Sequence, residues 1–272
     1  MKISCAIFDL DGTLLTSENR ISEKDLKTLR DLSREGVKII IATGRSELQI
    51  KQYVNELSIA DPIITCNGGA ILNPVTREII HERFLRPEDA KRMITEFEDE
   101  GSDYLFYSHD YIYHGPTSRR IDFYKNYNAK TPEKFRVPIR CATEYPEDEE
   151  GYRNIRKVLI SDDEKRLSEL FERFGGNGTV ECVISGKNLI DIMPENTSKG
   201  RAIKILSEHF SIPLSEIVAF GDSPNDAEML QTAGFSVAMG NAEESVKKIA
   251  DFVTKTNDEF GITYALEYIK RL

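Results

Sequence analysis

Short apolar segments alternate with amphipathic segments along much of the chain. Apolar runs occupy residues 3–8, 37–42 and 63–66, and residues 22–35 and 46–57 between them carry apolar side chains at helical spacing. A strand that is buried on both faces of a parallel sheet reads as a continuous apolar run, because neither face is polar. The first part of the chain therefore predicts a parallel sheet covered by helices on both faces.

The middle of the chain has a different pattern, because strands and helices no longer alternate regularly. A hairpin over 70–81 is followed by expected helices at 88–100 and 164–174 and by expected strands at 104–108, 111–114, 157–161 and 179–184. Regular alternation returns with an expected strand at 188–193. It continues with helices at 198–210, 226–233, 242–250 and 264–271 and strands at 217–220, 235–238 and 251–253.

These patterns predict an α/β fold with a doubly wound, Rossmann-like parallel-sheet core and a smaller inserted α+β domain. Residues 1–82 and 188–272 are expected to form a discontinuous core, and residues 83–187 the inserted domain. A length of 272 residues suits two modest domains.

Composition and charge exclude several classes of protein. The chain has 36 Lys and Arg against 46 Asp and Glu, a net charge of −10, which disfavours nucleic acid or an anionic membrane as its main partner. No apolar stretch approaches the roughly 20 residues of a membrane span, and the first residues lack the apolar region of a signal peptide. The four cysteines are scattered, which disfavours zinc and disulfide frameworks. We expect a cytoplasmic protein, monomeric or a small homo-oligomer.

Polar residues follow several of the predicted core strands directly. Ligands of an open parallel sheet bind outside the carboxyl ends of its strands, so these residues are expected to share one crevice. The segments are Asp9-Leu10-Asp11-Gly12-Thr13, Thr43-Gly44-Arg45, Asn67-Gly68-Gly69 and Gly221-Asp222-Ser223-Pro224-Asn225-Asp226.

The carboxylates of this crevice predict a metal site. Asp9 and Asp11 are two residues apart, which places both side chains on one side of an extended chain, and Asp222 comes from another strand. Three clustered carboxylates repel one another unless a cation neutralises them, and Mg²⁺ is the usual choice. Thr43 and Lys199 both suit a phosphoryl group next to that metal. One aspartate could then attack phosphorus while the other transfers the proton.

Together with Lys199-Gly200, the segments at Asp9, Thr43 and Gly221 resemble the haloacid dehalogenase (HAD) superfamily of phosphatases in sequence and order. The inserted domain is similar to the C2-type α/β cap of the Cof-type sugar-phosphatase branch, and the resemblance covers nearly the whole chain. Asn196 departs from the pattern, because relatives often have glycine there.

The resemblance implies a role for each matching residue. Asp9 would be the nucleophile and a Mg²⁺ ligand, and Asp11 the acid/base, with its backbone carbonyl on the metal. Asp222 would be a further metal ligand, and Asp226 would support the metal from outside its ligand shell. Thr43, Gly44, Lys199 and Asn225 would bind the phosphate of a small phosphorylated metabolite, such as a sugar phosphate or a phosphorylated cofactor.

Other interpretations explain parts of the same sequence. A calcium loop is disfavoured, because the glycine stands at position four of the segment from Asp9 and position twelve is Arg20. A phosphomutase of the same superfamily would pass the phosphoryl group to a second hydroxyl. A non-catalytic phosphate-binding protein would be expected to have lost Asp9, Asp11, Lys199 or Asp222, and the sequence keeps all four.

Two features of the inserted domain suggest function less strongly. Seven basic residues and two acids lie between residues 115 and 140, which is more typical of a solvated surface than of a positively charged lid. The aromatic residues between 104 and 127 are more typical of a domain core than of a sugar-stacking surface.

Overall fold

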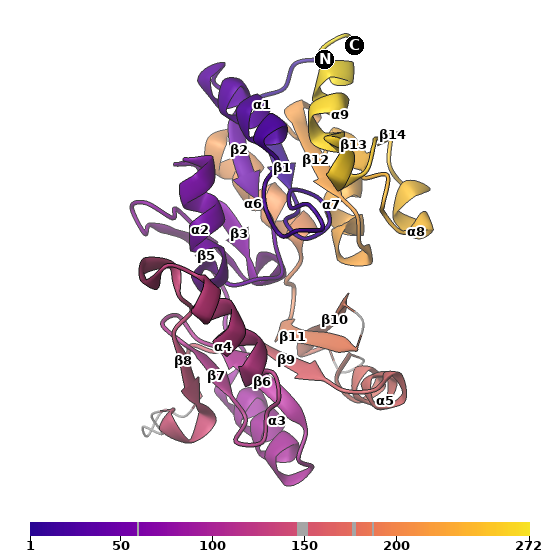
Figure 1. Cartoon of the computed structure of the whole chain (residues 1–272). Helices are drawn as coiled ribbons and strands as arrows, with labels where there is room; N and C mark the ends of the chain where they lie inside the picture. Colours follow the sequence, from indigo (N-terminus) through magenta and orange to yellow (C-terminus); the bar gives the residue numbers. More distant parts are fainter. Residues whose placement is uncertain (59, 146–151, 176–177, 187) are drawn as a thin grey trace. The chain divides into compact units, whose positions relative to one another are not determined.

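A computed structural model describes residues 1–58, 60–145, 152–175, 178–186 and 188–272, which fall into two units (Figure 1). The core unit comprises Met1–Gly44, Ile50–His81 and Ser198–Leu272. The inserted unit comprises Arg45–Gln49 and Glu82–Thr197. Each unit has its own sheet and its own buried apolar cluster.

The core unit is built on a five-stranded parallel sheet in the order β14-β13-β12-β1-β2. Its strands are β1 (Cys5–Phe8), β2 (Lys38–Ile41), β12 (Ile217–Gly221), β13 (Phe235–Ala238) and β14 (Phe252–Val253). All side chains of β1 and β12 are buried, as expected for strands covered on both faces. Phe8 of β1 is in register with Phe220 of β12, and the two rings stack. The parallel-sheet core predicted from the apolar runs is confirmed.

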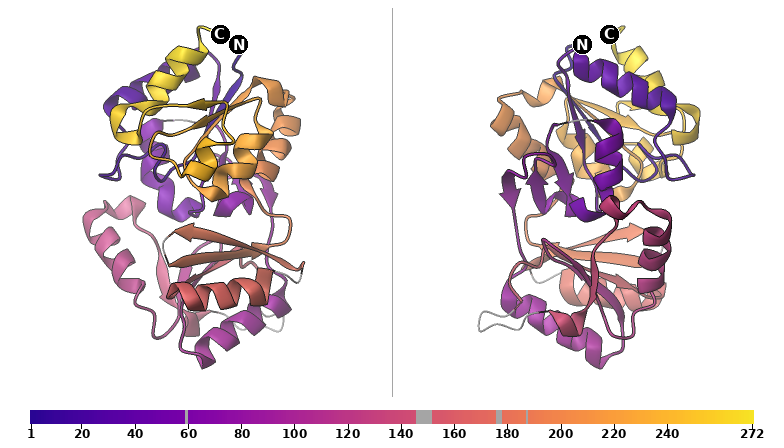
Figure 2. Two further views of the ribbon diagram at one scale, coloured as in Figure 1. Left: turned by 90° about the vertical axis from the view of Figure 1, so that its right-hand side faces the viewer. Right: turned by 60° about the vertical axis from the view of Figure 1, so that its left-hand side comes forward.

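Helices cover both faces of this sheet. They are α1 (Glu23–Arg34), α2 (Glu47–Leu57), α6 (Lys199–Phe210), α7 (Ala227–Thr232), α8 (Glu244–Lys247) and α9 (Gly261–Ile269). α1 and α9 lie side by side on one face, and α6 and α7 on the other (Figures 1 and 2). The α1 helix starts where the sequence indicated, because the side chain of Ser22 caps it by accepting a hydrogen bond from the backbone N–H of Asp25.

The third apolar run does not extend the parallel sheet as expected. β3 (Ile63–Thr65) lies next to the end of β2, where a single parallel bridge joins Ala42 and Ile64, but it is not a strand of the five-stranded sheet. It pairs antiparallel with β4 (Ala70–Leu72), and β5 (Ile79–Glu82) completes a three-stranded sheet. The chain reverses at once after Thr65, so this strand is part of a hairpin.

The inserted unit contains a six-stranded sheet in the order β10-β11-β9-β6-β7-β8. Neighbouring strands are antiparallel except for β7 and β8. The strands are β6 (Asp103–Tyr107), β7 (Ile112–His114), β8 (Ile139–Cys141), β9 (Lys157–Ser161), β10 (Val180–Gly186) and β11 (Leu189–Pro194). The helices are α3 (Pro87–Asp99), α4 (Ile121–Lys130) and α5 (Glu164–Gly175).

Apolar side chains cover both faces of this sheet. α3 and α5 lie along one face (Figure 2), where Phe97 and Phe174 pack with Phe106. On the other face, Tyr124 of α4 packs with Tyr107. Most aromatic residues between 104 and 127 are therefore buried in the core of this unit, as the sequence suggested, although Phe123 is 53% exposed.

Two further predicted elements were wrong in sheet or length, and two elements were not predicted. The strand at 188–193, assigned to the core, is β11, which pairs with β9 and β10 of the inserted unit, so the chain returns to the core unit near Ser198. The helix expected over 242–250 is only α8. α4 and β8 were not predicted, because a single α4 side chain, that of Tyr124, is buried and the helix shows little apolar periodicity.

Short 3-10 helices occur between these elements, at η1 (Cys66–Gly68), η2 (Glu133–Phe135), η3 (Ala142–Glu144), η4 (Leu214–Glu216), η5 (Pro224–Asp226) and η6 (Asn257–Glu259). Among the described residues, no helix combines the length and the apolar character that crossing a membrane requires.

Candidate active site

The candidate site lies where the strand order of the core sheet reverses. From β1 the chain continues to β2 on one side, and its later strands, β12 to β14, extend the sheet on the other. Crevices at such switch points are the usual ligand sites of doubly wound sheets. Asp9 directly follows β1, and its backbone N–H donates a hydrogen bond to Phe220 O on β12 at 2.9 Å. Asp222 directly follows β12, so both carboxylates lie at the carboxyl ends of neighbouring strands.

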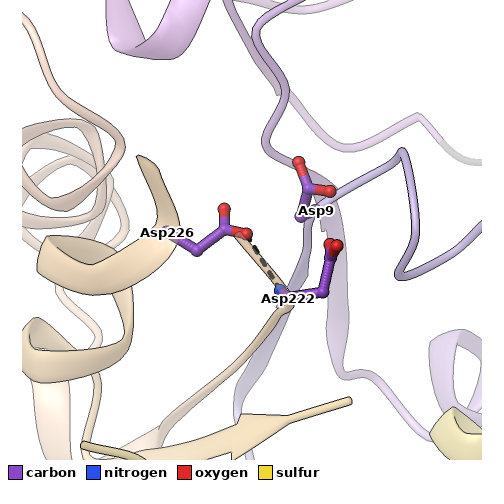
Figure 3. Close-up of side chains that lie close together, drawn as sticks. All are labelled: Asp9, Asp222 and Asp226. Carbon is purple, nitrogen blue, oxygen red and sulfur yellow. Dashed lines mark hydrogen bonds between the residues drawn. The ribbon is translucent and has the colours of Figure 1, made fainter. Parts of the chain in front are cut away.

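Three carboxylates converge at this point. Asp9, Asp222 and Asp226 each offer one oxygen, and these atoms all lie within 4.8 Å of one another (Figure 3). Asp226 is fully buried and Asp9 is 5% exposed. Such a cluster needs positive charge beside it, because burial and mutual repulsion both disfavour the ionised state.

Lys199 supplies part of that positive charge. Its Nζ lies 2.5 Å from Oδ1 of Asp9 and 2.7 Å from Oδ1 of Asp226, and its side chain is completely buried. Burial opposes the charge of this lysine, but Asp226 and Asp9 raise its pKa above the usual value. The position is set locally, because Lys199 is the first residue of α6, whose N-cap Ser198 accepts a hydrogen bond from the backbone N–H of Arg201.

Asp226 organises the loop after β12. While Oδ1 contacts Lys199, Oδ2 accepts hydrogen bonds from the backbone N–H groups of Asp222 at 3.0 Å and Ser223 at 3.1 Å. Both carboxylate oxygens therefore have partners within the protein. Asp226 is suited to hold Lys199 and the Asp222 backbone in place.

The pKa values of the other two carboxyl groups reflect this crowded environment. Burial raises the pKa of Asp9 well above its ordinary value; Lys199 opposes the shift, and Asp226 and Asp222 add to it. Burial, followed by repulsion from Asp226, raises the pKa of Asp222 to about 6. Hydrogen bonds from Thr13 Oγ1 at 2.9 Å and Ser223 Oγ at 3.1 Å act in the opposite direction. A cation beside these carboxylates would favour their ionised forms.

Asp11 lies outside this buried cluster. Its side chain is exposed, and it precedes a turn in which Gly12 has a φ of +80°. A Cβ on Gly12 would lie 2.5 Å from Oδ2 of Asp222, so the turn is packed directly against the cluster. The structure thus places the backbone beside Asp11 next to the carboxylates and leaves the Asp11 side chain accessible.

The expected phosphate-binding residues are connected through a residue to which the sequence assigned no role, Asn67. Its Oδ1 accepts a hydrogen bond from Nδ2 of Asn225 at 3.2 Å, and its backbone N–H donates to Thr43 O at 3.0 Å. Gly44 is packed so closely that a Cβ would lie 3.0 Å from Asn67 Oδ1. Asn67 is 2% exposed with a φ of 54°, and the polar strand end Asn67-Gly68-Gly69 was the signal that marked its position.

The same turn joins this group of residues to Lys199. Gly68 has a φ of +100°, and a Cβ on it would lie 2.2 Å from Ser198 O and 3.3 Å from the backbone N of Lys199. Sequence reasoning also missed Thr13, whose hydroxyl contacts Asp222; its place directly after Asp11-Gly12 was the available signal. Asn196 has a φ of 60°, which explains why glycine and asparagine can replace each other there.

The arrangement is suited to phosphoryl chemistry. Carboxylate oxygens are ligands that Mg²⁺ prefers. Lys199 contacts Oδ1 of Asp9, and hydroxyl groups contact the oxygens of Asp222, whereas Lys199 and two backbone N–H groups engage both oxygens of Asp226. A lysine next to a carboxylate can neutralise the negative charge of a phosphate. The donors that converge here therefore fit a divalent cation and a phosphate held side by side.

Comparisons with known proteins agree with this chemistry. A family model described as haloacid dehalogenase-like hydrolase matches residues 6–266. The chain is 30% identical to phosphatase YwpJ of Bacillus subtilis, over 96% of this chain and 98% of that protein. It is 31% identical to the 5-amino-6-(5-phospho-D-ribitylamino)uracil phosphatase YwtE of the same organism, over 98% of both. The solved structure of the HAD subclass IIB sugar phosphatase BT4131 is similar, with a TM-score of 0.81, 26% identity and coverage of 99% of this chain and 100% of that one.

Proposed function

This chain belongs to the haloacid dehalogenase superfamily as a Cof-type phosphatase, a phosphoric monoester hydrolase, and we propose that it uses Mg²⁺ and an aspartyl-phosphate formed on Asp9. Its substrate is a small phosphorylated metabolite, either a sugar phosphate or a phosphorylated cofactor. The observation that carries the proposal is the contact of Lys199 with Asp9, inside a cluster that also contains Asp222 and Asp226.

The residues that would hold Mg²⁺ are the carboxylates of Asp9 and Asp222 and the backbone carbonyl of Asp11. Asp226 would support the metal site without binding the metal directly, because Lys199 and two backbone N–H groups already engage both of its oxygens. When bound, the metal would neutralise the carboxylates and polarise the phosphoryl group, which allows the negative carboxylate of Asp9 to approach the negative phosphate.

Asp9 is assigned as the nucleophile. Lys199 contacts its Oδ1, so Oδ2 is the oxygen assigned to attack phosphorus. A bond forms between this oxygen and phosphorus, while the bond from phosphorus to the ester oxygen breaks. Lys199 also faces the transferred group as a fixed positive charge, and fixed charges of this kind stabilise the transition state without reorganisation.

Asp11 is assigned as the acid and base. It donates a proton to the leaving ester oxygen and later takes a proton from the water that attacks the aspartyl-phosphate. That second attack forms a bond between the water oxygen and phosphorus, breaks the bond to Asp9 and releases inorganic phosphate. Its exposure supports the role, because an acid/base group has to reach both a leaving alcohol and a solvent water.

Thr43, Gly44 and Asn225 are assigned to the phosphate, together with Lys199. The position of Asn67 supports this assignment, since its side chain binds Asn225 and is closely approached by Gly44, and its backbone N–H binds the carbonyl of Thr43. The inserted unit is assigned the role of a cap that selects the substrate. Its place in the chain, between the segments of Thr43 and Lys199, supports that role.

The proposal is tested with Asp9→Asn, which keeps the size of the side chain and removes the nucleophile. We expect phosphate release from p-nitrophenyl phosphate to fall to background in this variant, and in the natural sequence after chelation of Mg²⁺. Asp110→Asn, at an exposed position in the inserted unit, is the matched control and should retain the full rate. An unchanged rate in folded Asp9→Asn would refute the nucleophile assignment.

A second measurement separates hydrolysis from phosphoryl transfer between hydroxyl groups. A panel of phosphorylated metabolites, including hexose 1-phosphates, is incubated with the enzyme, and both free phosphate and isomeric products are followed over time. Hydrolysis predicts free phosphate in equal amount to the dephosphorylated product. Appearance of an isomer without free phosphate would contradict the proposal and identify a mutase.

A further inference from the structure

We infer that Asn241 and Asn257 are positioning residues, which hold the turn next to Asp11 and so fix this carboxyl group for proton transfer. The inference rests on the proposed role of Asp11 as acid and base. It concerns two residues outside the carboxylate cluster, both on segments that follow β13 and β14 in the core unit.

The two asparagines bind the turn at both of its ends. Nδ2 of Asn241 donates a hydrogen bond to the backbone carbonyl of Gly12 at 2.8 Å. Nδ2 of Asn257 donates to the backbone carbonyl of Leu15 at 2.7 Å. The asparagines are also joined to each other, because the backbone N–H of Asn257 donates to Oδ1 of Asn241 at 3.0 Å. Two hydrogen bonds therefore connect the turn to this pair of asparagines, and a third joins the two asparagines to each other.

The position of Asp11 depends on this turn. The backbone of Asp11 forms an isolated bridge with Leu15, and the backbone N–H of Leu15 donates to Leu10 O at 2.9 Å. Gly12, the next residue, has a φ of +80° and is packed against Asp222 on its other side. A shift of the Gly12 or Leu15 carbonyl would therefore move the backbone of Asp11, and its carboxyl group would move with it.

Burial does not fix Asp11, since its side chain is exposed while those of its neighbours Leu10 and Leu14 are buried. The hydrogen bonds of the asparagines hold the backbone that carries it. The segments that carry the asparagines are joined to each other, because the backbone N–H of Gly240, next to Asn241, donates to Lys255 O at 2.9 Å. Asp258, next to Asn257, adds a contact by accepting from the backbone N–H of Ser17 at 2.9 Å.

Without the hydrogen bonds from the asparagines, proton donation by Asp11 to the leaving group should be impaired more than the attack of Asp9 on phosphorus. A leaving group that is stable as an anion, such as p-nitrophenolate, hardly needs a proton from Asp11. An alkoxide leaving group, as in β-glycerol phosphate, depends on it, so misplacement of the acid slows that substrate selectively. A general loss of folded protein would slow both substrates by the same factor.

The test compares kcat/KM for these two substrates in Asn241→Ala and Asn257→Ala. We expect kcat/KM for β-glycerol phosphate to fall about tenfold more than kcat/KM for p-nitrophenyl phosphate, because a general acid is partly lost. Asn241→Asp should show the same pattern, because it keeps the acceptor for Asn257 and replaces the donor facing Gly12. Asn126→Ala, at an exposed position of α4, is the control and should change neither rate.

The Asp11→Asn variant is measured with the same two substrates. It distinguishes the proposed acid role of Asp11 from the positioning role of the two asparagines. If Asp11→Asn slows both substrates equally, the proposed acid role is wrong and the inference fails with it. If Asp11→Asn is selective for β-glycerol phosphate and the asparagine variants are not, the acid role stands and the positioning role is refuted. Should Asn241→Ala fail to fold, Asn257→Ala and Asn241→Asp decide the outcome by the same comparison.

Discussion

The ammonium group of Lys199 lies 2.5 Å from Oδ1 of Asp9, and the lysine side chain is fully buried beside this nearly buried carboxylate. Such a pair is held together because either charge alone would be strongly disfavoured at the same place. Lys199 also contacts Asp226, so it faces two carboxylates. This single lysine therefore links the stability of the core unit to the chemistry of the proposed site.

Replacing Lys199 with methionine should cost both stability and activity. The change leaves Asp9 and Asp226 buried without their positive partner, a loss of about 3–5 kcal/mol in similar cases. We expect the metal-free protein to unfold at clearly lower urea concentration and kcat to fall by about 100-fold or more. Lys204→Met, at an exposed position of the same helix, should alter neither. Equal stability of the two variants would contradict the charge-compensating role.

The raised pKa of Asp222 predicts how the stability of the metal-free protein varies with pH. Its pKa is about 6 in the folded protein, against an ordinary value of 3.8, so the folded state binds more protons between these values. The contribution of this group to stability is therefore complete below pH 3.8 and is lost as the pH rises through 6. The loss amounts to at most about 3 kcal/mol.

Asp222→Asn should accordingly stabilise the metal-free protein above pH 6, and the gain should shrink as the pH falls toward 4. Thermal unfolding in the presence of a chelator measures this difference. Added Mg²⁺ should stabilise the natural sequence at pH 7 but should have much less effect on the variant, because a proposed ligand is missing. A variant that is less stable than the natural sequence at pH 8 without metal would contradict the expected sign.

The convergence of Asp9 and Asp222 could be predicted because it follows from topology. Residues that directly follow parallel strands lie at the same edge of the sheet, because all the strands have their carboxyl ends there. The partners of Asp226 and Asn67 could not be predicted in this way. They depend on how the loop after β12 and the turn after β3 fold back, and their contacts join residues that are 27 and 158 positions apart.

The error at β11 has a similar physical cause. Leu189, Ile190, Ile192 and Met193 form an apolar run that reads equally well as a core strand or as an antiparallel strand of a second sheet. Only the pairing of Ile190 and Ile192 with β9 decides between the two. Short apolar runs thus predicted the presence of most strands in this chain, but not the sheet to which each belongs.

Asn67→Gly should weaken phosphate binding. The change removes the acceptor for Asn225 but keeps the backbone freedom that a φ of 54° requires, so the loss of stability should be that of one hydrogen bond, about 1 kcal/mol, without added backbone strain. Loss of one such hydrogen bond costs about 1 kcal/mol, and we expect the inhibition constant of inorganic phosphate to rise about fivefold. Asn188→Gly, also at positive φ but in the inserted unit, is the control. An unchanged inhibition constant would show that Asn67 does not contribute to phosphate binding.

Two glycines with similar backbone angles allow the contact between the Asn67 turn and α6 to be tested directly. A Cβ on Gly36, which has a φ of +91°, would meet nothing within 4 Å, whereas a Cβ on Gly68, at +100°, would lie 2.2 Å from Ser198 O. Gly36→Ala should therefore cost only the backbone strain, about 1–2 kcal/mol, and leave kcat unchanged. Gly68→Ala should cost more and should also lower kcat, because Ser198 can move away only by displacing Lys199. Urea unfolding and p-nitrophenyl phosphate hydrolysis measure both effects, and equal losses in the two variants would show that the close approach does not position the lysine.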